Sequence, residues 1–481
     1  MSRSSSSKRV LELLKKFESR NLAFIDPEGT WPIVWARARG VHVWDAEGKK
    51  YLDLTAAFGV AAAGHANPRV VKAGQNQMAR LLHAMGDIHP HPLKAQLARE
   101  LSRITFERWS ADNPLASVPS VSSRENPSPF TGKTIFCSSG FESVEAALKT
   151  ARLATGKPGI IAFEGAYHGL GYGALNATHR QFFRAPFRDQ LKQFARFVPF
   201  PQEFVAQASS LLYRRFPTCD VPVDSKSKRA VLRDSKMNSL KSQLRRLFRQ
   251  SPIGAVLVEP VQGRAGIRIP PASFLPMLRR LCDEHGALLI VDEIFTGFGR
   301  TGRWFACEHT RTLPDLICLG KALAGGFPIS ACVGKAGLMD AAWPESSGEA
   351  IHTSTFLGHP VGCAMALAQI AELEKRKLVQ ASASRGTELL SALKTLQAPP
   401  SLRLSTRGLG LMAALELCLP DGRPATAETF SILKRMLQRG YILIPEGEHG
   451  NIISFTPPLT ITKAQLLETV QVLAKTLHEA F

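Results

Sequence analysis

The sequence predicts an α/β fold, in which a large domain carries a mainly parallel sheet and a smaller α+β domain follows it. Over the middle of the 481-residue chain, short apolar runs typical of buried strands alternate with helical patterns. The C-terminal part instead combines long helical patterns with separated strands. Because 44% of the residues are hydrophobic and 21% are charged, the composition is that of a globular protein with an ample core.

The N-terminal residues 1–17 are basic and rich in serine but lack the apolar core of a secretory signal. They predict a frayed end that leads into a short helix. A mitochondrial transit peptide is the alternative, and Glu12 and Glu18 argue against it because such peptides avoid acidic residues. We therefore expect a cytoplasmic protein. The segment 41–59 alternates apolar residues on both sides of a turn signal, which predicts a hairpin.

The predicted strands of the large domain are short apolar runs. Helical patterns such as 142–154 and 274–284 separate most of them, and this alternation is typical of parallel strands joined by crossover helices. The seven runs are 134–137, 159–163, 194–198, 255–259, 287–292, 316–319 and 329–334.

Two stretches, 110–133 and 216–237, lack periodicity and are rich in Ser, Pro, Asn or basic residues, so we expect loops or insertions there. Residues 211–250 hold eleven Lys and Arg against three Asp, within a net charge of +20 for the chain. Such a segment can bind nucleic acid or an anionic membrane, although a solvated insertion is the commoner explanation. We call residues 216–250 the basic insertion.

Other protein classes conflict with the sequence. No apolar run approaches the roughly 18 residues that a membrane span requires. The eight cysteines form no CxxC pair, and the couples Cys282 with His285 and Cys307 with His309 stand alone. This pattern argues against a disulfide framework or a zinc site, so no metal is expected.

The smaller domain is predicted from the change of pattern near the C-terminus. A long helical pattern begins at about Gly362, and strands are expected around 408–417 and 451–455. A final helix is expected from Thr462. This order of elements predicts an α+β domain.

Polar residues that directly follow predicted strands are the candidates for chemistry, because ligands bind at the carboxyl ends of strands in an open α/β sheet. Ser138, Ser139 and Gly140 lead from a strand into a helix. The free N–H groups at that helix start can hold a phosphate. A capping box from Ser139 to Glu142 explains the same residues equally well.

An aromatic residue and two acids follow other strands. Tyr167, beside His168, can stack on a planar cofactor or simply belong to the core. Glu259 and Asp292 end apolar strands, where a buried carboxylate needs a partner. A structural ion pair is the alternative explanation for each acid.

Lys321 favours a cofactor site over the structural explanations of these residues. It follows a strand and is flanked by Gly320, Gly325 and Gly326. A buried lysine loses its hydration, so its amine is more easily neutral, and a neutral amine forms an imine with an aldehyde. Asp292 upstream can keep a ring nitrogen protonated, and the helix start can hold a phosphate. Together these residues indicate pyridoxal phosphate.

These residues belong to seven motifs, SSGFESVEAAL, FEGAYHG, VEPVQG, VDEIFTGFGRTG, LGKALAGGFP, HTSTFLGHPVGCA and RGLGLM. Their order resembles the class III aminotransferases of pyridoxal-phosphate fold type I, from about Val41 to the C-terminus and with the two insertions omitted. The resemblance implies a mainly parallel seven-stranded sheet and a small domain built from both termini. The implied domains are 1–65, which joins the small domain, 66–350, the large cofactor-binding domain, and 351–481, the rest of the small domain.

The resemblance also implies roles for single residues. Lys321 would be the Schiff-base lysine, and Asp292 the partner of the pyridine nitrogen. Thr355 would reach the phosphate of the neighbouring subunit, which implies a homodimer with shared active sites. Arg407 would bind a substrate carboxylate, a task that suits a guanidinium. The remaining implied cofactor-binding residues are Ser139, Gly140 and Phe141 at the phosphate, Tyr167 stacked on the ring, Gln262 near the ring hydroxyl, and also His168 and Glu259.

Two positions depart from the family pattern. Relatives that act on ω-amino groups usually have glutamate at the position of Arg264, where it pairs with the carboxylate-binding arginine. Arg264 and Arg407 would instead repel each other or jointly bind a more acidic substrate, so both are candidate substrate-binding residues. Phe141 replaces a small hydroxyl residue, and we expect phosphate binding to be weaker or differently shared.

The leading hypothesis is an aminotransferase that moves an amino group from an ω-amino acid, a diamine or a related amine to a 2-oxo acid by a ping-pong mechanism. An aminomutase or a decarboxylating relative is the alternative within the same cofactor chemistry. The alternative from another class is a protein that binds nucleic acid or an anionic surface through the basic insertion and has a vestigial enzyme site.

Overall fold

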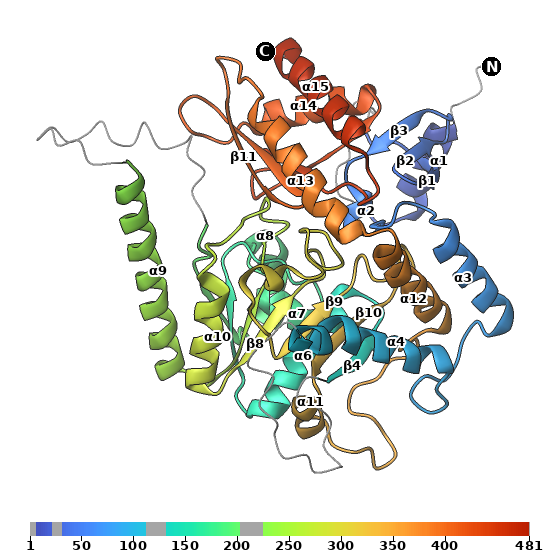
Figure 1. Ribbon diagram of the computed structural model, residues 1–481, viewed down its shortest axis with the longest axis vertical. Helices are drawn as coiled ribbons and strands as arrows, with labels where there is room; N and C mark the ends of the chain where they lie inside the picture. The colour runs from blue at the N-terminus through green and yellow to red at the C-terminus, as the bar shows by residue number, and fades with distance from the viewer. Residues whose placement is uncertain (1–5, 22–30, 112–130, 203–224, 481) are drawn as a thin grey trace, which may run out of the picture.

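The computed structural model describes residues 6–21, 31–111, 131–202 and 225–480. Most of the loop predicted at 110–133 and the first part of the basic insertion, 216–224, lie outside the described residues. Three sheets organise the described chain (Figure 1).

The largest sheet has seven strands in the order β4-β10-β9-β8-β7-β5-β6. Neighbouring strands from β9 to β6 are parallel, while β10 is antiparallel to both β4 and β9. Each predicted strand is present with its ends shifted by two residues or fewer, which confirms the mainly parallel seven-stranded sheet. The strands are β4 (Gly132–Cys137), β5 (Gly159–Phe163), β6 (Ala195–Val198), β7 (Ile253–Val258), β8 (Leu288–Asp292), β9 (Leu316–Leu319) and β10 (Ser330–Lys335).

Successive residues of a strand point to opposite sides of the sheet, and the side chains on both sides are buried. On one side, Leu257 and Ile290 pack in a cluster with residues of α6 (Gly140–Thr155), α7 (Tyr172–Ala177) and α11 (Ala336–Ala342). On the other side, Val256 and Val291 belong to the main core, which includes residues of α4 (Pro92–Ser102), α10 (Phe274–His285) and α12 (Pro360–Lys375). Helices on both faces of a parallel sheet explain why its strands read as continuous apolar runs.

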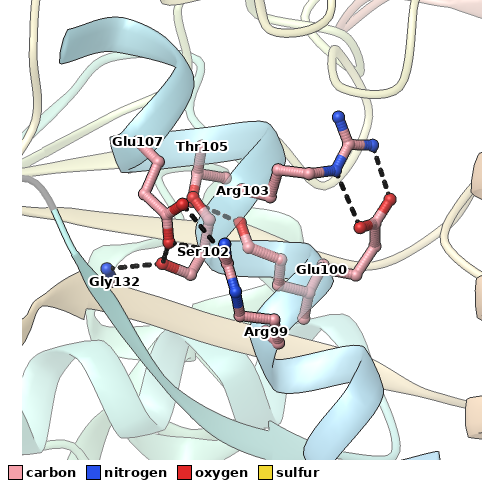
Figure 2. A network of polar contacts seen from close by, with 8 residues as sticks. Arg99, Glu100, Ser102, Arg103, Thr105, Glu107 and Gly132 are labelled. Carbon is pink, nitrogen blue, oxygen red and sulfur yellow. Dashed lines mark hydrogen bonds and ion pairs between the residues drawn. The ribbon is translucent and has the colours of Figure 1, made fainter.

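A polar network fixes the segment that leads to β4 (Figure 2). After α4 the chain continues into η1 (Arg103–Glu107) and α5 (Arg108–Ala111). Ser102 Oγ donates to Glu107 Oε1 at 2.6 Å and accepts from the Gly132 N–H at 2.9 Å, while Arg99 Nη1 bonds both oxygens of Glu107 at 2.7 Å. The network joins the end of α4 to the first residue of β4.

The N- and C-terminal parts of the chain share a four-stranded sheet of order β1-β2-β3-β13. The predicted hairpin is present as the antiparallel pair β2 (His42–Asp45) and β3 (Lys50–Asp53), and β1 (Trp35–Arg39) lies beside β2. The neighbour of β3 on its other side is β13 (Tyr441–Ile442), which runs parallel to it. A unit built from both termini is thereby confirmed.

The third sheet is antiparallel, with the order β11-β12-β15-β14. It contains β11 (Arg403–Leu409), β12 (Met412–Cys418), β14 (Ile444–Glu446) and β15 (Ile452–Phe455). The helices beside it in Figure 1 are α13 (Leu378–Lys394), α14 (Thr426–Gln438) and α15 (Lys463–Ala480). The other helical segments are α1 (Ser6–Phe17), α2 (Ala56–Gly59), α3 (Pro68–Arg80), α8 (Gln181–Arg184), η3 (Ala185–Gln190) and η4 (Ala306–Thr310).

The basic insertion differs from its prediction, because α9 (Ser225–Gln250) is a helix where 216–237 was expected to be a loop. Its Lys, Arg, Leu and Met residues are good helix formers. Met237, Leu240 and Leu244 recur at helical spacing and are buried in the main core. In Figure 1, α9 stands at the outer edge of the molecule beside α10. Tertiary packing of this apolar stripe therefore stabilises a segment whose overall composition is polar.

None of the helices in the described part of the chain combines the length and hydropathy of a transmembrane segment. The same residues contain no group of three His, Cys, Asp or Glu side chains placed to hold a metal ion.

Candidate active site

A cavity of about 470 Å³ is lined by loops that follow the strands of the large sheet. Such loops carry the ligand sites of open α/β sheets. Eight of the predicted site residues line this cavity, although they are spread over almost 200 positions of the sequence: Gly140, Phe141, Tyr167, His168, Glu259, Arg264, Asp292 and Lys321.

Lys321 lies two residues after the end of β9. Its Nζ atom is 4.7 Å from the centroid of the Phe295 ring, so the amine contacts an aromatic wall as well as the cavity. Burial lowers the pKa of Lys321, against the opposing effect of the acidic side chains Asp292, Glu259 and Glu446. A lowered pKa increases the fraction of neutral amine, which is the nucleophilic form.

Asp292 and His168 form a buried pair on the cavity wall. His168 Nδ1 lies 2.7 Å from Asp292 Oδ2, and the Ile294 N–H donates to Asp292 Oδ1 at 3.0 Å. The His168 side chain is fully buried, and its N–H on the backbone donates to Thr178 Oγ1. His168 and the Ile294 N–H together orient the Asp292 carboxylate through both of its oxygens.

Glu259 holds together two of the loops that line the cavity. Its Oε1 accepts from the Tyr167 N–H at 3.0 Å, and its Oε2 accepts from the Gly263 N–H at 3.1 Å. Burial raises the pKa of Glu259 to about 7, and the nearby Asp292 charge acts in the same direction. These contacts fix the backbone that carries the Tyr167 ring.

The start of α6 forms another part of the wall. Glu142 Oε2 accepts from the N–H groups of Ser138 and Ser139, at 2.7 and 2.8 Å. The predicted capping box of Ser139 and Glu142 is thus present, although Ser139 Oγ is buried and forms no full hydrogen bond with the described residues. Gly140 and Phe141 begin the helix, where no preceding turn supplies acceptors for their N–H groups.

Phe141 packs against the loop that contains Tyr167, His168 and Gly169. A Cβ atom built on Gly169 would lie 2.3 Å from the Cβ of Phe141, and the backbone of Gly169 has a φ of +108°. Both the close approach and the positive φ require glycine at this position. Gly169, the last glycine of the FEGAYHG motif, therefore lets the loop that carries Tyr167 and His168 pack directly against the helix start.

Four predicted site residues are absent from the cavity lining: Ser139, Gln262, Thr355 and Arg407. Ser139 adjoins the lining residues Ser138 and Gly140. Gln262 is buried, and its Nε2 donates to the Glu164 carbonyl at 2.9 Å. Thr355 lies on an exposed turn, so a single chain does not bring it to the cavity.

Arg407 is buried and its guanidinium is already engaged. Nε donates to the carbonyls of Gly266 and Ile267, at 2.8 and 2.9 Å, and Nη1 bonds Glu416 Oε2 at 2.6 Å. The structure therefore places this arginine beside the cavity-forming loop 263–267 rather than in the cavity itself.

The residues present fit the cofactor that the sequence indicates. Three buried polar atoms in these loops have no hydrogen-bond partner in the described ranges: Ser139 Oγ, His168 Nε2 and Gln262 Oε1. Buried polar atoms are costly when unpaired, so such a group marks a place where a polar ligand or water is bound. An anion-binding helix start, a buried carboxylate and a lysine with a lowered pKa match a phosphate, a ring nitrogen and an aldehyde.

Sequence reasoning missed two charged residues near Arg264. Glu446 ends β14, and its carboxylate lies 3.7 Å from Arg264 Nε. An acid at the end of a strand was the signal that marked Glu259 and Asp292, and the same signal was available here. Arg180 donates through Nη2 to the Arg264 carbonyl at 2.6 Å, and no pattern in its own segment marks it.

Comparisons with known proteins agree with this geometry. The family model of the class-III aminotransferases matches residues 24–477. The chain is 34% identical to 5-aminovalerate aminotransferase of Pseudomonas aeruginosa, over 93% of this chain and 94% of that protein. It is also 34% identical to putrescine aminotransferase of Pectobacterium atrosepticum, over 91% of this chain and 81% of that protein.

A solved structure shows the same similarity in three dimensions. An amine transaminase from an uncultivated Pseudomonas species, described as pyridoxal-phosphate-bound, superimposes with a TM-score of 0.77 at 27% identity. The superposition covers 97% of this chain and 98% of the other. The likeness therefore includes both the large sheet and the sheets built from the termini.

Proposed function

Because the chain belongs to the class-III aminotransferase family, we propose that it moves an amino group from an ω-amino acid, a diamine or a related amine to a 2-oxo acid by a ping-pong mechanism. Enzymes of this family use pyridoxal phosphate. The names of two relatives support the donor class, since one acts on 5-aminovalerate and the other on putrescine. The single observation that carries the proposal is the convergence of Lys321, Asp292 and Tyr167 on one cavity.

Bound in this cavity, pyridoxal phosphate would supply an aldehyde that takes up the amino group and a protonated ring that withdraws electrons. Lys321 Nζ would bind the cofactor and later accept and return a proton, which its lowered pKa favours. Asp292, oriented by His168, would hold the proton on the ring nitrogen. We thus propose Lys321 and Asp292 as the catalytic residues.

The other cofactor contacts follow from the same arrangement. The Tyr167 ring would lie against the cofactor ring, on a loop that Glu259 fixes. The start of α6, at Ser139, Gly140 and Phe141, would hold the phosphate, and Gln262 would lie near the ring hydroxyl. The site lies in the large domain, for which we propose the boundaries 66–350, with 1–65 and 351–481 forming the smaller one.

We further propose a homodimer in which Thr355 completes the cofactor site of the second copy. Its exposed turn and its absence from the lining of its own cavity support this assignment. Sedimentation velocity of the holoenzyme tests it, since a monomer at micromolar concentration would contradict a shared site. We propose a cytoplasmic location, which the seven unpaired cysteines of the described chain support.

The decisive experiment is an absorbance spectrum of the purified protein supplied with pyridoxal phosphate, followed by single additions of candidate amines. A visible band that disappears with a donor and returns with a 2-oxo acid is the expected result. Turnover that needs no 2-oxo acid would indicate an aminomutase, and release of carbon dioxide a decarboxylating relative. A protein that takes up no cofactor would overturn the proposal.

If the protein takes up no cofactor, the basic insertion becomes the candidate binding segment. Retention on heparin or DNA that falls steeply with salt and vanishes when residues 216–250 are deleted would identify it as a binding segment. The packing of Met237, Leu240 and Leu244 in the main core instead supports a structural role for the described part of α9.

A further inference from the structure

Arg264 is a positively charged residue of the cavity lining that has no role in the proposed transfer of the amino group. It lines the cavity near Lys321, and its guanidinium carbon lies 5.5 Å from the centroid of the Tyr167 ring. About a third of its side chain is exposed, although its Nε atom is buried and has no hydrogen-bond partner in the described residues. Arg264 therefore presents a charge to the cavity with part of its bonding capacity unused.

The position of Arg264 is set by its backbone. Its carbonyl accepts from Arg180 Nη2 at 2.6 Å and from the Gly447 N–H at 3.2 Å. Both contacts come from segments far away in the sequence, one after β5 and one after β14. These contacts fix the backbone from which the Arg264 side chain reaches the Tyr167 ring.

Glu446 lies behind Arg264 and is almost fully buried, with 3% of its side chain exposed. The 3.7 Å between its Oε2 and Arg264 Nε exceeds hydrogen-bond distance, so the contact is electrostatic. A buried carboxylate at this separation partly cancels the positive charge that Arg264 presents. Burial raises the pKa of Glu446 to about 7, and the charges of Arg264, Arg180 and Lys321 oppose this shift.

Arg407, the other candidate for a substrate carboxylate, has little capacity left. Its guanidinium already bonds two backbone carbonyls and Glu416, and 6% of its side chain is exposed. A ligand would have to break these bonds before Arg407 could bind it. In contrast, no described residue forms a hydrogen bond with Arg264 Nε, and the carboxylate of Glu446 lies 3.7 Å from this atom.

We propose that Arg264 is the anchor for the distal carboxylate of the donor in this chain, and that Glu446 is a counter-ion which limits how strongly that carboxylate is preferred. Arg180 is a positioning residue for the same loop. The inference rests on the proposed function and specifies its donor site. With Glu446 charged, the site still admits donors whose distal end is uncharged or cationic, and this balance sets the breadth of the donor range.

The test compares three donors of equal length: 5-aminopentanoate, 1-aminopentane and 1,5-diaminopentane. Their distal ends are anionic, uncharged and cationic. Arg264→Met should lower kcat/KM for 5-aminopentanoate by about 10- to 100-fold, mainly through KM, because a charge-assisted contact is lost. The same variant should change kcat/KM for 1-aminopentane by less than about threefold, and Arg264→Lys should recover part of the loss.

Glu446→Gln keeps the shape of the side chain and removes its charge. It should lower KM for 5-aminopentanoate several-fold and raise KM for 1,5-diaminopentane, with KM for 1-aminopentane shifting by less than either. A merely structural role of Glu446 would move all three donors together. Arg245→Met is the matched control. Arg245 of α9 forms an exposed ion pair with Glu284 of α10, and neither residue lines the cavity. It should alter none of these ratios.

A binding measurement separates this inference from the proposed function. Pentanoate has the distal carboxylate but no amine, so calorimetry of pentanoate with the holoenzyme reports the anchor without turnover. Arg264→Met should abolish measurable binding, and Glu446→Gln should strengthen it. Failure of every donor to react while pentanoate binding still depends on Arg264 would sink only the proposed function. Equal losses for all three donors, or a selective loss in Arg407→Met alone, would overturn the role of Arg264.

Discussion

His168 Nδ1 lies 2.7 Å from Asp292 Oδ2, so two side chains 124 positions apart in the sequence form one buried unit. The histidine comes from the loop after β5 and the aspartate from the end of β8. Each fixes the direction of the other, and the free His168 Nε2 faces no partner in the described chain. The unit makes the orientation of Asp292 a property of the folded apoprotein.

Replacing His168 with Phe should weaken cofactor binding by about 10- to 100-fold, since a hydrogen bond to a buried charge contributes about 1.5–3 kcal/mol. Asp292 Oδ1 would keep its bond from the Ile294 N–H, while Oδ2 would lose the imidazole. Equilibrium dialysis of pyridoxal phosphate measures the change. His285→Phe is the control, because His285 at the end of α10 stacks on Phe248 of α9 and does not line the cavity. Equal affinities for both variants would contradict the orienting role.

Lys321→Ala should reduce turnover by at least about 10²-fold and remove the lysine-dependent visible absorption of the holoenzyme. Thermal stability should be retained, because burial lowers the pKa of Lys321 and disfavours its charged form in the folded protein. Lys157→Ala should behave in the opposite way. Lys157 Nζ donates to the carbonyls of His285 and Gly286, so its loss should cost about 1–2 kcal/mol of stability without an effect on turnover. Turnover retained in Lys321→Ala would remove this lysine from the chemistry.

Gly169→Ala should lower the free energy of unfolding by about 2–5 kcal/mol, from a strained backbone and from contact with Phe141. Gly156 provides the comparison. It has a φ of +66° at the end of α6, and nothing lies within 4 Å of the Cβ that an alanine would add. Gly156→Ala should therefore cost only about 1–2 kcal/mol. Urea unfolding of the two variants measures both values, and equal costs would mean that the loop gives way to the added methyl group.

The preference between anionic and cationic donors should depend on pH through Glu446. Its pKa is raised to about 7, so it is mostly neutral below that pH and mostly charged above it. As pH rises from 6 to 8, KM for 5-aminopentanoate should increase relative to KM for 1,5-diaminopentane. Glu259, whose pKa is also raised to about 7, and Lys321, whose pKa is lowered, lie in the same cavity lining, so the pH profile of the KM ratio is compared with that of Glu446→Gln. A ratio with the same pH profile in Glu446→Gln would contradict this assignment.

The large sheet could be predicted from the sequence because its strands β5, β7, β8 and β9 are apolar on both faces and end near a glycine or a polar residue. The residues lining the cavity after β5, β7, β8 and β9 were predictable for the same reason, since a buried strand followed by Glu259, Asp292 or Lys321 is a local signal. The helix α9 was missed because its stabilising contacts are tertiary. Its three core residues are separated by polar ones, and only packing in the main core shows their common face.

Contacts between distant segments account for what sequence reasoning could not supply at the site. Arg407 was expected to face a substrate, but its bonding to Gly266, Ile267 and Glu416 depends on how β11 and β12 approach the loop 263–267. Likewise, Arg180 and Glu446 meet Arg264 only after three separate segments have folded together. No local sequence pattern predicts these contacts between distant segments.

The pairing of β3 with β13 has a consequence for synthesis on the ribosome. Tyr441 and Ile442 are the parallel neighbours of Leu52 and Asp53, and the Leu52 N–H donates to the Gly440 carbonyl at 2.7 Å. The hairpin emerges early, but one edge of it stays open until more than nine-tenths of the chain has been made. During that interval the nascent protein exposes an unpaired strand edge, which is the feature most prone to join another chain. Slow translation of the C-terminal part would lengthen this exposure, whereas a circular permutant that brings the two segments together would shorten it.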